Sequence, residues 1–177
     1  FDDTLVDPWG NPSPTYESLG ELARVLVPAM PALLDAVEPA DGLPPVEYAA
    51  DRLLLGRLRG ACGDALVFTS KDLLEPYTGT VRVAVPAGRE VYDLLNLCVA
   101  APGGGTCELS LPPGGGAILL VAAGETWETV RRGILTRRLE QERERLAVEC
   151  AVLQAQGLDL RAAREALGRV AADGSGG

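Results

Sequence analysis

Short apolar stretches separated by turn residues run through the middle of the chain, from Val46 to Val121. Leu66 and Phe68 alternate with Val67 and Thr69, which is the two-residue period of a strand with two different faces. Each stretch is flanked by Gly, Pro or Asp, and short strands with frequent turn signals are typical of an antiparallel sandwich. The six predicted strands cover residues 52–59, 65–70, 80–85, 89–94, 108–111 and 117–121.

The clearest reversal is the Pro-Pro-Gly-Gly-Gly run at residues 112–116. Proline cannot donate to a strand ladder and glycine accepts positive φ, so we expect a hairpin turn here. The strand after it is wholly apolar. We predict Leu119 and Val121 on one face and Ile118 and Leu120 on the other, with at least one pair in the core between the sheets.

Helical spacing precedes the strand region. Ser13 is a candidate N-cap, Pro14 suits the first helical position, and apolar residues then recur every three or four positions. These residues are Leu19, Leu22, Leu26, Met30 and Leu33. Pro28 and Pro31 lie inside the pattern and predict a kink or division near Val27. We expect this apolar face to pack on the sandwich, on the carboxyl-terminal helices or on a second copy of the chain.

A second helical region follows the strands. Residues 125–156 are dense in Arg and Glu, with pairs such as Glu142 and Arg145 at helical spacing, and predict one long helix. Gly157 is placed to end it, and residues 160–170 predict a second helix. The apolar stripe of the long helix is narrow and consists of Leu135, Leu139, Leu146, Cys150 and Leu153.

The predicted fold class is therefore α+β: an antiparallel β-sandwich of about six strands, flanked by an N-terminal helix and a C-terminal helical hairpin. Three segments follow from this pattern. Residues 1–45 form a loop and helix, residues 46–123 the sandwich, and residues 124–177 a helical tail with a disordered end.

The composition of the chain limits the partners and the kinds of site that it can have. The net charge of -9 argues against a nucleic-acid partner, and no apolar run approaches the about 20 residues of a membrane helix. The chain contains no histidine, which excludes Ser-His-Asp and Cys-His catalysis and every histidine metal site. We expect neither a metal nor a cofactor. No secretory signal is visible, which favours the cytoplasm, and a chain that begins with Phe1 suggests a truncated start.

The four cysteines form no Cys-x-x-Cys pair. Cys98 and Cys107 flank a glycine-rich loop and could face each other across a hairpin. We interpret the cysteines as small buried hydrophobic residues in a reduced compartment.

Residues 7–19, Asp-Pro-Trp-Gly-Asn-Pro-Ser-Pro-Thr-Tyr-Glu-Ser-Leu, resemble the segment that follows the last barrel strand in β-galactosidase-like glycoside hydrolases. In that family a loop of Asp, Gly and Pro leads into the last helix of the TIM barrel. Segments further along the chain are similar to the small β-sandwich after such barrels, and they cover residues 53–59, 65–72, 89–94 and 111–120. The resemblance ends at Val121. It implies that the chain is the carboxyl-terminal part of a larger hydrolase-like protein.

The resemblance also limits the site. The two catalytic carboxyl groups of the family come from earlier barrel strands, so no catalytic residue is carried over. Asp2 and Asp3 would lie just beyond the last barrel strand, where such barrels bind substrate, and Trp9 belongs to the same loop. These three residues are candidate sugar contacts. Their alternative roles are solvated turn residues for the two aspartates and buried packing for Trp9.

Two functions remain as hypotheses. The first is a non-catalytic accessory domain of a glycoside hydrolase-like protein, which supports the barrel and contributes to oligomerisation. Its partners would be the missing barrel domain or a second copy of the chain. The alternative is a free-standing β-sandwich module that binds carbohydrate or protein. The aromatic residues between positions 46 and 121 are scattered and include no tryptophan, which favours the first hypothesis.

Overall fold

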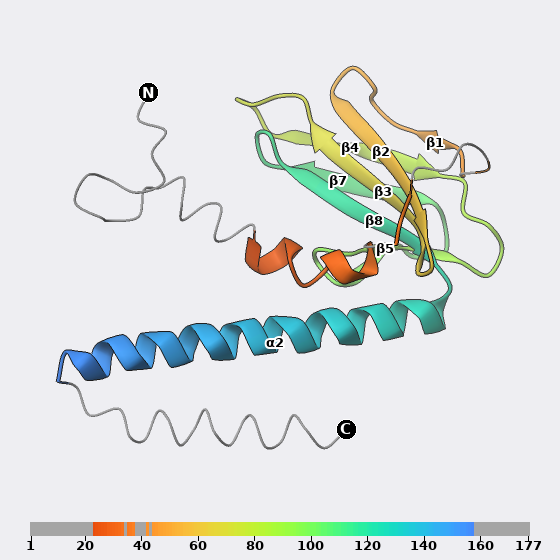
Figure 1. Ribbon diagram of the computed structural model, residues 1–177. Coiled ribbons are helices and arrows are strands. Elements are labelled where there is room, and N and C mark those ends of the chain that lie inside the picture. Colours follow the sequence, from red (N-terminus) through yellow and green to blue (C-terminus); the bar gives the residue numbers. More distant parts are fainter. Residues whose placement is uncertain (1–22, 34, 38–41, 43, 158–177) are drawn as a thin grey trace. The chain divides into compact units, whose positions relative to one another are not determined.

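The computed structural model describes residues 23–33, 35–37, 42 and 44–157 (Figure 1). Along the sequence, short helical elements precede the strands and one long helix follows them. In chain order the elements are η1 (Met30–Ala32), β1 (Val46–Glu47), β2 (Leu53–Gly60), β3 (Gly63–Ser70), β4 (Tyr77–Val83), β5 (Glu90–Asp93), β6 (Cys98–Ala101), β7 (Thr106–Leu111), β8 (Gly116–Ala122) and α2 (Gly124–Ala155).

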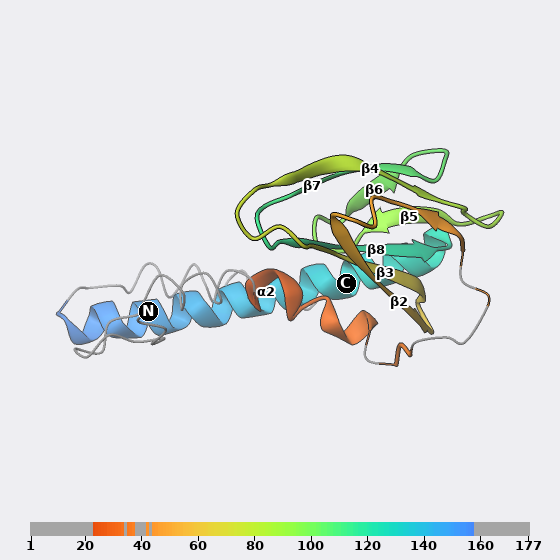
Figure 2. The same ribbon diagram turned by 90° about the horizontal axis from the view of Figure 1, so that it is seen from above.

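The strands form two antiparallel sheets. One has five strands in the order β2-β3-β8-β5-β6, and the other has three in the order β1-β4-β7. Side chains from both sheets meet in one buried cluster, so the arrangement is a sandwich-like α+β fold (Figure 2). The sequence predicted about six of these eight strands. It missed β1, which has two residues, and β6, whose small, partly exposed side chains give little strand signal.

The core between the sheets is mainly aliphatic. From β3 it takes Leu66 and Phe68, and from β8 it takes Leu119 and Val121. The three-stranded sheet contributes alternate residues of β4 and β7, whose other faces are exposed. The predicted face of Leu119 and Val121 is therefore confirmed.

A second buried cluster lies on the other face of the five-stranded sheet. Ile118 and Leu120 belong to it, on the face opposite Leu119 and Val121 as predicted, and Trp127 and Ile134 from the first turns of α2 complete the same cluster. The Trp127 indole stacks on the Tyr92 ring with 4.5 Å between ring centroids. β8 is thus buried on both faces, which explains why its sequence is apolar throughout.

The predicted hairpins at the two glycine-rich turns are wrong. β7 pairs with β4, whereas β8 pairs with β3 and β5, so the Pro-Pro-Gly-Gly turn carries the chain from one sheet to the other. The turn before β7 does the same, since β6 belongs to the five-stranded sheet. The proline and glycine residues cause the chain to reverse direction at this turn, but the burial of each strand's faces determines which strands pair. A strand that is apolar on both faces needs a central place under a helix.

The sheet change also separates two cysteines. Cys107 is buried in the inter-sheet core, as predicted, whereas Cys98 is exposed on β6, against the prediction. All four cysteines are free thiols. Cys98 lies on β6 and Cys107 on β7, which belong to different sheets, so the two cysteines do not face each other across a hairpin.

The amino-terminal segment is not one continuous helix in its described part. Residues 23–26 form a helical turn, closed by a hydrogen bond from the Val27 N–H to the Ala23 carbonyl, and η1 follows after Pro28. Leu26 and Leu33 pack against the second cluster, but Met30 is exposed, so the predicted single apolar face is wrong at Met30. Proline interrupts the helical period and rotates that face. The predicted helix start and Leu19 and Leu22 lie outside the described residues.

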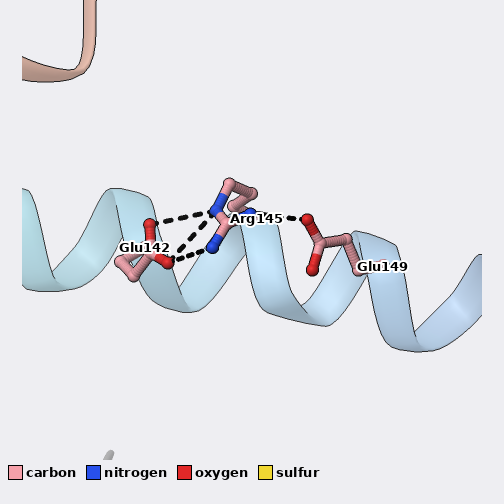
Figure 3. A network of polar contacts seen from close by, with 3 residues as sticks. All are labelled: Glu142, Arg145 and Glu149. Carbon is pink, nitrogen blue, oxygen red and sulfur yellow. Dashed lines mark hydrogen bonds and ion pairs between the residues drawn. The ribbon is translucent and has the colours of Figure 1, made fainter. Parts of the chain in front are cut away.

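α2 confirms the predicted long helix. The chain divides into two compact units, Phe1–Ile134 and Leu135–Gly177, and the boundary between them falls within α2. In the second unit, Arg145 forms ion pairs with Glu142 and Glu149 along the helix (Figure 3). Gly157, with φ of 89°, follows its end as predicted. Most of the predicted apolar stripe is exposed, including Leu139. The predicted second helix lies outside the described residues. Among the described helices, none has the length and apolar content needed to cross a membrane.

Candidate functional site

A buried carboxylate marks one end of the five-stranded sheet. Arg59 and Asp64 lie directly opposite each other on β2 and β3, next to the tight turn that joins these strands. The Arg59 Nε–H donates to Asp64 Oδ1 at 2.6 Å. Gly63 makes the turn possible, because its φ is 130° and a Cβ there would lie 2.5 Å from the Val121 carbonyl oxygen.

A second arginine reaches the same carboxylate from the loop before β5. The Arg89 Nη1–H donates to Asp64 Oδ2 at 3.3 Å, across 25 positions of sequence. Asp64 is only 2% exposed, whereas the two arginine side chains are 43% and 42% exposed. An unpaired buried carboxylate would be strongly destabilising, and the two guanidinium groups offset its charge.

Arg59 also anchors a more distant part of the chain. Its Nη2–H donates to the Gly42 carbonyl oxygen at 2.8 Å. The hydrogen bond with Asp64 raises the pKa of Arg59 above its ordinary value, so this guanidinium stays charged. Arg59 therefore joins the β2–β3 hairpin to Gly42.

These groups border a cavity of about 860 Å³. Its wall consists mainly of glycine, alanine and proline from the β2–β3 turn, from the segment of Gly42, Pro44 and Pro45, and from the loop that follows β4. Arg59, Asp64 and Arg89 are the charged lining residues in the part of the chain that the structure describes. Two cations and one anion leave this wall with a net positive charge. Asp35 lies next to the turn, where its Oδ2 accepts a hydrogen bond from the Ala61 N–H at 3.0 Å.

A smaller cavity of about 580 Å³ lies beside the loop between β3 and β4. Three of its charged lining residues, Lys71, Arg52 and Asp72, are engaged in the fold: the Lys71 Nζ donates to the Ala50 carbonyl oxygen, and Arg52 lies over the Tyr77 ring. Asp72 Oδ1 accepts the N–H groups of Leu74 and Glu75, each at 2.9 Å. These bonds lower the pKa of Asp72 below its ordinary value.

The Asp93 carboxylate has a comparable structural role. It accepts the N–H groups of Leu95 and Asn96 and the side-chain amide of Asn96, and so fixes the turn after β5. Over residues 23–33, 35–37, 42 and 44–157, no group of three or more cysteine, aspartate or glutamate side chains could hold a metal ion.

The sequence-predicted candidates Asp2, Asp3 and Trp9 lie outside the described residues. Sequence reasoning missed Arg59, Asp64 and Arg89 as a group. One signal was present, because Arg59 and Asp64 carry opposite charges at equal distances from the centre of a glycine turn, which places them opposite each other in a hairpin. Arg89 gave no such signal, since its contact depends on the order of strands in the sheet.

Comparisons of the chain with protein-family models, with curated proteins and with solved structures gave no match. The resemblance to β-galactosidase-like glycoside hydrolases therefore stays a prediction, carried by the sequence segments quoted for it.

Proposed function

We propose that the chain is a non-catalytic accessory domain of a larger glycoside hydrolase-like protein, in which the sandwich supports a separate catalytic barrel. The observation that carries this proposal is that the buried and half-buried carboxylates of the sandwich serve as structural hydrogen-bond acceptors. Asp64, Asp72 and Asp93 each accept hydrogen bonds that hold a turn or a strand end in place.

Glycoside hydrolysis needs a different arrangement. One carboxyl group has to stay protonated as a general acid, which requires a raised pKa, and a second has to lie across the sugar bond. The Asp72 pKa is lowered by backbone N–H groups, and the Asp64 carboxylate is held by two arginines. The lowered pKa of Asp72 favours its ionised form, and the oxygen atoms of Asp64 are both engaged by arginines, so the two carboxylates act as structural acceptors.

The loop between β3 and β4 offers a surface for packing on another domain. Leu73 and Leu74 are adjacent and are 76% and 88% exposed. The Asp72 side chain fixes the backbone beneath them, and the Asp72 carbonyl accepts the Gly114 N–H at 2.7 Å. Two leucines held outward on a fixed turn lose little entropy on docking. We expect this tip to contact the catalytic barrel of the same protein.

The second candidate function is a free-standing carbohydrate- or protein-binding module. One observation favours it: the cavity beside Asp64 has the size of a small-molecule site, and Arg59, Asp64 and Arg89 contribute charged groups to its wall.

The test of the proposal is an activity assay of the purified chain on aryl β-galactosides and aryl β-glucosides over a range of pH. We expect no turnover. Turnover that disappears in Asp2→Asn, Asp3→Asn or Asp64→Asn, while the circular dichroism spectrum stays unchanged, would show that the chain carries its own catalytic carboxylates and would overturn the proposal.

A further inference from the structure

The cavity beside Asp64 has a property that a purely structural ion pair does not require. Two arginines, Arg59 from β2 and Arg89 from the loop before β5, meet on one carboxylate, and both side chains also form part of the wall of an open space of about 860 Å³. Cavities that bind small molecules range over about 300–1,000 Å³ and have a few convergent polar groups. The arrangement therefore combines the volume of a ligand site with oriented charge.

Asp64 gives the two guanidinium groups a fixed orientation. Its two oxygen atoms take one arginine each, Oδ1 from Arg59 and Oδ2 from Arg89. Because the carboxylate is buried and the guanidinium groups are about half exposed, the negative charge lies behind the positive charges as seen from solvent. Asp64 also lines the cavity, so its charged wall has two cations and one anion, which is a net positive charge.

The arginines keep hydrogen-bonding capacity in this position. Within the described residues, Arg89 uses Nη1 on Asp64, and Arg59 uses Nε on Asp64 and Nη2 on the Gly42 carbonyl. A guanidinium group has further N–H donors and no acceptor, and its planar fork matches the oxygen atoms of a carboxylate or a phosphate. Glycine and proline in the wall add no side-chain acceptor that would compete.

We propose that this cavity binds a small oxyanion group, a carboxylate or a phosphate, through Arg59 and Arg89, with Asp64 as the residue that positions them. The inference is independent of the glycoside hydrolase proposal, because it uses only the geometry of the cavity. An acidic sugar would supply the carboxylate and a phosphorylated metabolite the phosphate. The two sources share the chemistry that the arginines recognise.

The experiment uses the whole chain at constant ionic strength and follows thermal unfolding and isothermal titration with three probes: inorganic phosphate, D-glucuronate and neutral D-glucose. We expect saturable binding and a raised Tm with phosphate, with glucuronate or with both, and none with glucose. Phosphate alone would assign a phosphate ligand, and glucuronate alone a carboxylate ligand. Failure of both anions to bind would overturn the proposal.

Arg89→Gln removes one donor group while Arg59 keeps Asp64 paired, and we expect anion affinity to fall about tenfold or more. Arg82→Gln is the matched control, since Arg82 is an exposed arginine of β4 paired with Glu47 at 3.8 Å, and it should bind as the parent does. Equal affinities of the two variants would contradict the assignment.

A measurement on the unmodified chain covers the case in which Arg89→Gln does not fold. Phenylglyoxal reacts with accessible arginines, and peptide mapping gives the rate at each site. We expect the binding anion to slow the modification of Arg59 and Arg89 but not of Arg82. Unchanged rates at Arg59 and Arg89 under saturating anion would refute the proposed site.

Discussion

The packing of β8 leads to a sharp stability prediction. Leu119 is fully buried in the inter-sheet core and lies on the central strand of the five-stranded sheet, between β3 and β5. Leu119→Ala removes apolar contacts and leaves a space that both sheets restrict, so we expect a loss of about 2–5 kcal/mol in the free energy of unfolding. Leu74→Ala makes the same chemical change at a side chain that is 88% exposed, and it should cost less than about 0.5 kcal/mol.

Urea unfolding, followed by tryptophan fluorescence, measures both variants. The chain has two tryptophans, Trp9 and Trp127, so the series is made in a Trp9→Phe background in which Trp127 is the remaining reporter. Trp127 is buried against Tyr92 and reports on the sandwich unit. We expect Leu119→Ala to lower the midpoint without a change in the denaturant slope. If Leu119→Ala and Leu74→Ala had equal small effects, the assignment of Leu119 to the core would be wrong.

The remaining predictions concern three local environments. Burial raises the pKa of the Cys107 thiol to about 11, so a thiol-disulfide reagent at pH 8 should modify exposed Cys98 rapidly and Cys107 only on unfolding; comparable rates would contradict the buried position. Backbone hydrogen bonds lower the pKa of Asp72 in the folded chain below its ordinary value of 3.8, so its contribution to stability should be present above pH 3.8 and lost as the pH falls through the folded pKa. Asp72→Asn should flatten this part of the curve of stability against pH, and an unchanged curve would show that these hydrogen bonds do not cause the dependence. Gly63→Ala should destabilise the chain more than Gly88→Ala, because both glycines have positive φ but only at Gly63 would a Cβ meet a backbone oxygen; equal melting temperatures would refute the close approach to Val121.

Several features could be predicted from the sequence because local rules decide them. Alternation placed Leu66 and Phe68 on one face of β3 and Leu119 and Val121 on one face of β8. Charge and spacing predicted the long helix α2 and its end before Gly157. These features need only the strand and helix periods, which the side chains carry themselves.

Other features depend on contacts between distant residues. The Pro-Pro-Gly-Gly turn reads as a hairpin, but the pairing of β8 with β3 and β5 follows from burial of both its faces. The meeting of Arg89 with Asp64 follows in turn from that strand order. The candidate site could therefore be predicted only as far as the Arg59–Asp64 pair, whose two members flank one turn.

The most direct test of the accessory-domain proposal is to sequence the transcript upstream of the Phe1 codon. We expect an open reading frame that continues upstream and encodes a TIM barrel with two catalytic carboxylates on its strands. A start codon directly before Phe1, with no barrel in frame, would contradict the proposal and leave the binding module as the function of this chain.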